Sequence, residues 1–449
     1  GKIPEFWVAA AYHAGLSPRE RRKIQRDFME NRIRVLCATI SFGMGLDKRD
    51  IRGIVHYNIP GNLESYVQEI GRAGRDGIPA RCHLFVEPEG QDLLELRRHI
   101  HENSVDFWAV KTLIQRVFAP CKCREIHGKI QENSKEILEF PKNPRICRGH
   151  ERSIPIQEMV EALDLREEGI ETLLCLLELH PQKFLELFPP VHSRCQIRIP
   201  GNSMEPLREA ARGCPALGFV LARDPSGTLG IPGSLEFDVV ALSDSMGWEF
   251  RRVRESLRSI QWESRKGKTA RIQVEFREFS FHFRAYGDLD SRELDSVCDF
   301  LHSRVIAREK SELRRLQRCF QAFQSVAFPS CIPEPPEKLE LEKNSQLREL
   351  LREYFEQDPT ESEEDEEEKK PGIAPDQEEE IRAEIRKFLA AYPEEEFSGR
   401  AVARIFHGIG SPRFPSQIFG RDRRFWRRLL PLEFRSLSRL ASQEILAFR

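Results

Sequence analysis

The stretch that decides the fold is YVQEIGRAGRDG, residues 66–77, which places Arg72 and Arg75 three residues apart between glycines. Glycine weakens a helix, and holding an arginine side chain still costs conformational entropy. Small residues let the backbone approach a ligand while two guanidinium groups point at it. A surface helix with two solvated arginines is the plainer alternative, so the surrounding sequence must decide between them.

Short β-rich segments flank this stretch. Residues 33–39 (IRVLCAT), 51–60 (IRGIVHYNIP) and 80–88 (ARCHLFVEP) have the composition of strands buried in a parallel sheet. Asn62 is placed to cap a helix that continues into the glycine-rich stretch. Strand–helix–strand order predicts an α/β domain over residues 1–90, with ligand-binding loops at the strand ends.

Three motifs follow one another in this domain: AAYHAGLSPRERRKIQRDF (10–28), FGMGLDK (42–48) and QEIGRAGRDG (68–77). Together they resemble the second motor lobe of superfamily-two helicases. The last two resemble motifs V and VI of the RecQ family of DNA helicases. This resemblance implies a partial RecA-like second lobe that works on ATP with Mg²⁺.

The same resemblance implies a role for each residue around the nucleotide. Arg75 would be the arginine finger, a cation that neutralises charge on the γ-phosphate and contributes about 10³–10⁵ in rate. Arg72 would be its γ-phosphate partner, and Gln68 would sense the nucleotide state. Asp47 would contact the ribose or couple the sites, next to Gly45 in the same motif.

Lobes of this kind also hold one DNA strand at their strand ends. The resemblance implies phosphate contacts from Thr39, with the amide groups around it, and from the loop between His13 and Gly15. Such contacts position a strand without reading its sequence. A capping or core role explains His13 equally well.

Two motifs of a complete motor do not occur in the sequence. There is no G-x-x-x-x-G-K-[ST] phosphate loop and no D-E-x-[HD] magnesium box. The first motor lobe, and the first strand and helix of the second, are therefore expected upstream of this chain. We expect ATP and Mg²⁺ to be held mainly by that first lobe, and the chain alone not to hydrolyse ATP.

Metal-ligand residue types gather between residues 120 and 150. Cys121 and Cys123 form C-x-C, and Cys147 and His150 form C-x-x-H. Two close ligand pairs separated by a loop are how a small segment closes a tetrahedral Zn²⁺ site. RecQ helicases carry a four-cysteine zinc module directly after the motor, and this cluster departs from it in spacing and in its histidine. His127 is a rival fourth ligand, and free buried thiols are the other reading.

A helical segment and the zinc-binding module are predicted over residues 91–152. After them, a helix–turn–helix–strand pattern occurs twice. It predicts tandem winged-helix-like units over residues 153–234 and 235–290. The second helix of the first unit is acidic and apolar, which favours packing or protein contact. The second unit places Arg251 and Arg254 on one helix, where they are candidate DNA-binding residues.

The net charge of −2 hides a strong segregation of charge. Residues 356–380 carry 13 acidic residues and two lysines, a net charge of −11, whereas residues 397–449 carry 11 arginines and three acidic residues, a net charge of +8. This pattern predicts a helical region over residues 291–356, an acidic disordered linker over residues 357–380 and a basic helical C-terminal domain over residues 381–449.

Arginines alternate with aromatic residues in the segment FGRDRRFWRRLL, residues 419–430. Arginines bind phosphates and aromatic rings stack on bases, so this segment is a candidate nucleic-acid contact through Arg423, Arg424 and Arg427. A helix with an apolar stripe and a solvated basic face is the alternative.

With 449 residues the chain is too long for one core, which predicts a multidomain protein of α/β and α+β parts. No apolar run reaches the roughly 20 residues that span a bilayer, so no membrane partner is expected. The combined interpretation is the C-terminal half of an ATP-dependent 3′–5′ DNA helicase of the RecQ class. Its implied partners are single-stranded and forked DNA and replication or repair proteins, with a nuclear location and the cytoplasm as a second one. The competing interpretation is a non-catalytic, zinc-stabilised module that binds nucleic acid or protein.

Overall fold

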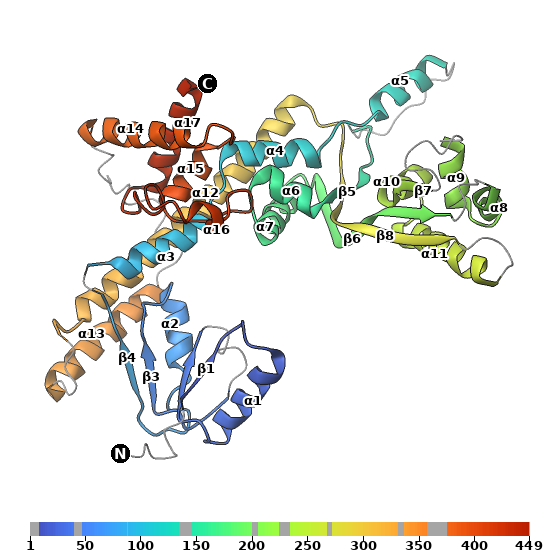
Figure 1. Cartoon of the computed structure of the whole chain (residues 1–449). Helices are drawn as coiled ribbons and strands as arrows, with labels where there is room; N and C mark the ends of the chain where they lie inside the picture. The colour runs from blue at the N-terminus through green and yellow to red at the C-terminus, as the bar shows by residue number, and fades with distance from the viewer. Residues whose placement is uncertain are drawn as a thin grey trace. The chain divides into compact units, whose positions relative to one another are not determined.

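The computed structural model describes residues 9–39, 47–87, 89–133, 145–199, 205–223, 234–266, 272–330, 336–356 and 375–448 (Figure 1). The chain divides into two compact units. The first comprises Gly1–Ile100 and Lys310–Pro371, and the second comprises His101–Glu309 and Gly372–Arg449. Two helices, α3 (Gln91–Glu102) and α12 (Ser291–Val326), contribute residues to both units.

The first unit contains two separate pairs of parallel strands. β1 (Ala9–Tyr12) pairs with β2 (Val35–Ala38), and β3 (Gly53–His56) pairs with β4 (Arg81–Leu84). Helix α2 (Leu63–Ile70) connects β3 to β4, which confirms the predicted strand–helix–strand order. The prediction of a single sheet is wrong for the described residues, because hydrogen bonds join these strands only in pairs.

The strands are also less buried than their composition predicts. The side chains of Val35 and Val55 are 52% and 62% exposed. A sheet of two strands has too few neighbours to cover side chains on both of its faces, so β-branched composition alone overestimates burial here.

Helices supply most of the core of the first unit. α1 (Pro18–Met29) begins with a capping box formed by Ser17 and Glu20. Tyr66 of α2 packs edge-on against Phe323 of α12, with 4.8 Å between ring centroids. The partly buried Leu351 of α13 (Glu337–Glu356) packs against the same cluster. The carboxyl-terminal turns of α12, together with α13, therefore cover α2.

The second unit is built on one antiparallel sheet with the strand order β5-β8-β6-β7. Its strands are β5 (His150–Pro155), β6 (Leu185–Arg198), β7 (Ser234–Asp238) and β8 (Gln273–Ala285). β6 and β8 pair along most of their length, with a bulge in β6 between Phe188 and Val191. The two predicted helix–helix–strand units thus place their strands in one shared sheet.

The helices on this sheet follow the predicted order. α6 (Ile156–Leu163) and α7 (Glu167–Glu178) form the first pair, and α10 (Val239–Met246) and α11 (Phe250–Lys266) form the second. The other helices of residues 101–233 are α4 (Phe107–Val117), α5 (Cys123–Asn133), α8 (Glu205–Gly213) and α9 (Pro215–Arg223).

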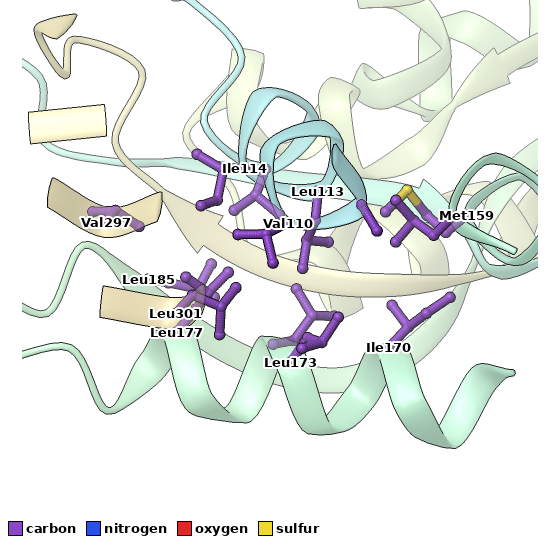
Figure 2. Close-up of a cluster of buried hydrophobic side chains, with 14 of the residues drawn as sticks. Val110, Leu113, Ile114, Met159, Ile170, Leu173, Leu177, Leu185, Val297 and Leu301 are labelled. Atoms are coloured by element: carbon purple, nitrogen blue, oxygen red, sulfur yellow. The ribbon is translucent and has the colours of Figure 1, made fainter. Parts of the chain in front are cut away.

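The main core lies where α4, α6, α7 and the start of α12 meet. Leu113 of α4, Leu173 of α7 and Leu301 of α12 are all buried and belong to one cluster, which Figure 2 shows with α7 along the lower edge. The apolar face of α7 is therefore used for packing, as its composition favours.

The C-terminal part of the second unit has its own aromatic core. Its helices are α14 (Pro375–Ala391), α15 (Gly399–Phe406), α16 (Ser416–Phe419) and α17 (Phe434–Phe448). Phe388 contacts Phe406 and Phe425 at the centre of this core.

Two expectations for this region need correction. An acidic linker was predicted over residues 357–380. Residues 357–374 lie outside the described residues, whereas residues 375–380 belong to α14. Residues 421–430 are not a helix but a series of turns. Arg427 there has a φ of 65°, which a right-handed helix does not contain.

Candidate nucleotide, metal and DNA sites

The loop after α2 carries both arginines of the predicted nucleotide site. Gly74 has a φ of 65°, and a Cβ atom there would lie 3.0 Å from the carbonyl oxygen of Ile78. The Gly74 amide also donates to the carbonyl oxygen of Ile51 at 3.0 Å. Glycine is required at this position because the backbone turns left-handed and passes close to its neighbours. The path of the arginine loop is thereby fixed against the segment that leads into β3.

Arg75 and Asp47 come together in this loop, although they lie 28 residues apart. Nη1 of Arg75 donates to Oδ1 of Asp47 at 3.0 Å, and its Nε donates to the carbonyl oxygen of Gly71 at 3.1 Å. The side chains of Arg75 and Asp47 are 37% and 71% exposed. The guanidinium is therefore oriented from both ends and still accessible to an anionic ligand.

The other residues of the predicted nucleotide site are placed less fully. Nε of Arg72 is buried and has no hydrogen-bond partner within the described residues. Gln68 is exposed in the last turn of α2, four residues before Arg72. Gly45 lies outside the described residues.

A second ion pair supports the loop, and sequence reasoning did not identify it. Nη1 of Arg52 donates to Oδ1 of Asp76 at 2.9 Å, and Nη2 contacts the other carboxylate oxygen. These hydrogen bonds lower the pKa of Asp76 to about 2. Asp76 follows Arg75 directly, so the pair ties the arginine loop to the residue before β3.

The predicted strand-end contacts of the first unit also lie together. β1 ends at Tyr12 beside Ala38 of β2, so His13 and Thr39 follow directly at the same edge of the sheet. The Thr39 amide donates to the carbonyl oxygen of Tyr12 at 3.1 Å. Gly15 lies in the turn after β1, where a Cβ atom would come within 3.1 Å of the His13 ring.

The four predicted metal ligands converge in the second unit. One ligand atom each from Cys121, Cys123, Cys147 and His150 lies within 4.8 Å of the others. Sγ of Cys123 is 3.2 Å from Nε2 of His150. Three thiols and an imidazole at this separation suit Zn²⁺ in a closed tetrahedral site. The rival His127 is not part of the group.

Residues from distant segments hold these ligands in place. Asp244 of α10 accepts from Nδ1 of His150 at 2.8 Å, the arrangement that orients a metal-binding imidazole. The Cys147 amide donates to Asp288 at 3.1 Å, and the Cys121 amide donates to the carbonyl oxygen of Gly287 at 2.9 Å. A Cβ atom on Gly287 would lie 2.7 Å from Cβ of Cys121, so a side chain there would displace the first ligand.

The two candidate arginines of α11 have different surroundings. The side chain of Arg251 is 86% exposed and pairs with Glu255 at 3.0 Å. Arg254 lies over the ring of Phe276, 5.3 Å from its centroid. Both line a cleft between α11, β6 and β8, together with Arg258.

The C-terminal arginines do not form the arrangement that the sequence suggests. Arg423 and Arg424 are exposed, and Arg424 pairs with Asp422 at 2.7 Å. Phe425 is only 5% exposed and belongs to the aromatic core, so the proposed stacking of bases on Phe425 is wrong. Arg427 is exposed, and its aliphatic stem passes close to Gly408, at which a Cβ atom would lie 2.2 Å from Cγ of Arg427.

Two buried arginines of α15 are the main residues that sequence reasoning missed. Arg400 and Arg404 are 4% and 2% exposed. Nη1 of Arg404 donates to the carbonyl oxygen of Asp164 at 2.8 Å, and Nη2 donates to those of Glu102 at 2.9 Å and Ser104 at 3.0 Å. Burial lowers the pKa of Arg404 to about 9, so it is still protonated at neutral pH.

Arg400 contacts the same two turns of the chain. Its Nη1 donates to the carbonyl oxygen of Ser104 at 3.2 Å, and its Nη2 donates to that of Leu163. Nε lies 3.4 Å from the carboxylate of Asp106. We call these contacts of Arg400 and Arg404 with the turns around Ser104 and Asp164 the arginine joint. Its only sequence signal is the spacing of the two arginines by four residues, which places them on one face of a helix.

Replacing Arg404 with methionine is expected to lower the free energy of unfolding of the second unit by about 3–5 kcal/mol, the usual cost of removing one partner from a buried charge. The carbonyl oxygens of Asp164 and Glu102 would lose their donor, that of Ser104 would keep only Arg400, and the carboxylate of Asp164 would lose a cation 3.5 Å away. The concentration of guanidinium chloride at which half of the chain is unfolded, followed by circular dichroism, measures the change. Arg423→Met is the matched control on the exposed surface, and equal midpoints for the two variants would contradict the buried joint.

Comparison with known proteins supports the class of the chain. The helicase conserved C-terminal domain family matches residues 4–77. ATP-dependent DNA helicase Q4 of Homo sapiens is 48% identical over 99% of the chain, and that of Mus musculus is 48% identical over 98%. ATP-dependent DNA helicase RecQ of Pasteurella multocida is 51% identical over 18% of the chain and 13% of its own length. The chain spans only 39% and 37% of the human and mouse relatives.

The chain contains a helicase conserved C-terminal domain and is similar over nearly its whole length to ATP-dependent DNA helicase Q4, which supports the RecQ family. Within the family, the segments ICRGHERSIPIQ (146–157) and SGRAVARIFHGIGSP (398–412) resemble the RecQ-like helicase of Rothmund–Thomson syndrome. They contain Cys147 and His150 of the metal cluster and the buried pair Arg400 and Arg404. Among the helices of the described ranges, none is long and apolar enough to cross a membrane.

Proposed function

We propose that this chain is the C-terminal part of an ATP-dependent 3′–5′ DNA helicase of the RecQ class, acting in DNA replication, recombination and repair. The observation that carries the proposal is the geometry of Arg75. Its guanidinium is oriented by Gly71 and paired with the exposed Asp47, at the loop where the family places its motif VI. An exposed carboxylate is a partner that phosphate oxygens can replace.

The arginine loop would act on a nucleotide held mainly by the first motor lobe. Mg·ATP supplies the phosphoryl group, and Arg75 and Arg72 neutralise charge on its γ-phosphate. Nε of Arg72 is buried and makes no hydrogen bond with the described residues, so the nucleotide would have to approach the side chain closely to use it. Gln68 and Asp47, with Gly45 of the same motif as Asp47, would relate the state of the nucleotide to the rest of the lobe.

DNA would lie along the strand-end edge of the first unit. Thr39 and the turn from His13 to Gly15 would contact phosphates of one strand there. Closure of the two lobes on ATP, and their reopening after hydrolysis, would then move single-stranded DNA in steps.

The second unit would add a zinc module and two winged-helix-like units that share a sheet. Cys121, Cys123, Cys147 and His150 would hold Zn²⁺, with Asp244 orienting the imidazole. Arg251 and Arg254 of the second winged-helix-like unit would contact DNA. Arg423, Arg424 and Arg427 would add a sequence-independent grip that weakens as the salt concentration rises.

Single-stranded and forked DNA are the proposed substrates, and replication and repair proteins are the proposed partners. A nuclear location follows from this role, with the cytoplasm as a second location. The alternative, a non-catalytic zinc-stabilised module, has no comparable support. Its only argument is that this chain contains no phosphate loop and no magnesium box.

The test is DNA-stimulated ATP hydrolysis and strand separation by the full-length protein. We expect single-stranded DNA to stimulate hydrolysis, and duplexes with a 3′ tail to be separated while those with a 5′ tail are not. The 449-residue chain alone, at the same concentration, is the control and should be inactive in both assays. A full-length protein whose hydrolysis does not respond to DNA would favour the non-catalytic alternative, and an equal response to RNA would broaden the substrate.

A further inference from the structure

A cleft of about 580 Å³ opens between α11 and the strands β6 and β8 of the second unit. The bulge of β6 forms one wall, because Phe188, Pro189 and Val191 line the cleft at the point where the register shifts. Sites for small organic groups commonly have volumes of about 300–1,000 Å³. The cleft is therefore large enough for one nucleotide-sized group.

Aromatic rings form the inner surface of the cleft. The ring of His282 lies between Phe188 and Phe250, at centroid distances of 4.9 Å and 5.5 Å. Both contacts are tilted rather than stacked, and the guanidinium of Arg284 lies over the Phe188 ring at 5.3 Å, so a further planar group would use the other face of the half-buried Phe188. A nucleobase is planar and stacks on such rings without regard to its identity.

The α11 wall is cationic. Arg254 and Arg258 lie over the ring of Phe276, at 5.3 Å and 5.7 Å, and neither forms an ion pair with any described residue. Nε of Arg254 is buried and has no hydrogen-bond partner within the described residues. Of the other charges that line this wall, Arg251 is already paired with Glu255 at 3.0 Å, and Glu249 offsets one of the two remaining arginines, which leaves one net positive charge. The unpaired charge on this wall therefore favours a phosphate.

Two further polar groups that line the cleft are weakly paired. Nε2 of His282 and Oε2 of Glu151 are buried and 3.5 Å apart, which is an ion-pair distance, but neither makes a hydrogen bond within the described part of the chain. The other carboxylate oxygen of Glu151 accepts from Arg284 at 2.9 Å. Buried polar atoms without a hydrogen bond are costly, and the polar edge of a base would supply one.

We propose that this cleft binds one unstacked nucleotide of single-stranded DNA. The base would lie against Phe188 and His282, with its edge towards Glu151, and the adjoining phosphate would bind Arg254 and Arg258. The proposal rests on the proposed function and extends it. For the surface around α11, the proposed function suggests only arginine contacts, and this proposal adds a base-binding subsite. An acidic peptide would use the arginines but not the aromatic rings.

The test measures binding of a fluorescent oligothymidylate of about 12 nucleotides, within the length that one binding module covers. Phe188→Ala is expected to weaken binding about 5- to 160-fold, the range for loss of one base–aromatic stack. The control Phe279→Ala removes a phenylalanine of β8 that is 48% exposed and does not line the cleft, and it should leave affinity unchanged. Arg254→Gln should reduce the salt dependence of binding, whereas Arg252→Gln, whose guanidinium lies over Trp248 at 4.4 Å, should not.

An abasic oligonucleotide of the same length separates base binding from phosphate binding. The wild-type chain should bind it more weakly than oligothymidylate, and Phe188→Ala should cause no further loss. An equal loss with both oligonucleotides, or preferential binding of an acidic peptide, would overturn the proposal. These binding measurements need no ATP hydrolysis. A full-length protein without helicase activity would contradict the proposed function, but the binding data would still test the cleft independently.

Discussion

Replacing Arg75 with alanine in the full-length protein is expected to lower kcat for DNA-stimulated ATP hydrolysis by about 10³–10⁵-fold, the usual contribution of an arginine finger. The physical reason is charge. The transition state of phosphoryl transfer spreads negative charge over the γ-phosphate oxygens, and a guanidinium held in place needs little reorganisation to neutralise it. Gly71 and Asp47 hold Arg75 in place at 3.1 Å and 3.0 Å. Steady-state hydrolysis at saturating single-stranded DNA measures the effect.

Two comparisons make this result specific. Arg81→Ala removes an exposed arginine at the start of β4 and should leave kcat within twofold, as expected for a surface substitution. DNA affinity of the Arg75 variant, measured without nucleotide, should equal that of the wild type. An unchanged kcat would remove Arg75 from the catalytic site, and a parallel loss of DNA affinity would point to misfolding of the loop.

Loss of zinc is expected to unfold much of the second unit. Zn²⁺ bound by such a ligand set contributes on the order of 10–16 kcal/mol in small zinc domains, which is comparable with the whole stability of a domain. The ligands come from Cys121 and Cys123 at the start of α5, from Cys147 before β5 and from the first residue of β5, so the metal would close the loop between α5 and β5. Cys123→Ser should abolish bound zinc and lower the thermal midpoint, as should a strong chelator.

Cys175→Ser and His127→Ala are the controls for this prediction. Cys175 is an exposed thiol on α7, outside the cluster, and its replacement should keep one zinc per chain by elemental analysis. His127→Ala should also keep the metal, since His127 is not part of the converging group. Zinc that persists in Cys123→Ser but disappears in His127→Ala would reassign the fourth ligand, and a wild-type chain free of zinc would leave a cluster of reduced thiols.

Local patterns in the sequence were sufficient for the elements of the first unit. Asn62 was expected to begin a helix, and its side chain accepts from the Ser65 amide at 2.7 Å at the start of α2. The parallel pairing of β3 and β4 follows from the helix between them. The pairing of β2 with β1 was not expected, because four residues of alanine and tyrosine give little strand signal.

Contacts between distant residues were beyond such reasoning. The metal ligands were found because each pair is close in sequence, but the carboxylate of Asp244 lies 94 residues from His150. Arg400 and Arg404 look like solvated helix arginines, because nothing nearby indicates that carbonyl groups some 240 residues earlier would accept their hydrogen bonds. The burial of Phe425 was beyond this reasoning as well, since its partner Phe388 lies on another helix.

The arginine joint also has a consequence for the order of events on the ribosome. Arg404 donates to the carbonyl oxygen of Asp164, which leaves the ribosome 240 residues earlier. At the usual rate of about 5–20 residues per second, that acceptor waits roughly 10–50 s for its donor. The turns around Ser104 and Asp164 therefore remain incomplete until Arg400 and Arg404 have been made. A premature stop codon anywhere before Arg400 would leave those turns without their buried donors, so it would damage a region far upstream of the missing residues.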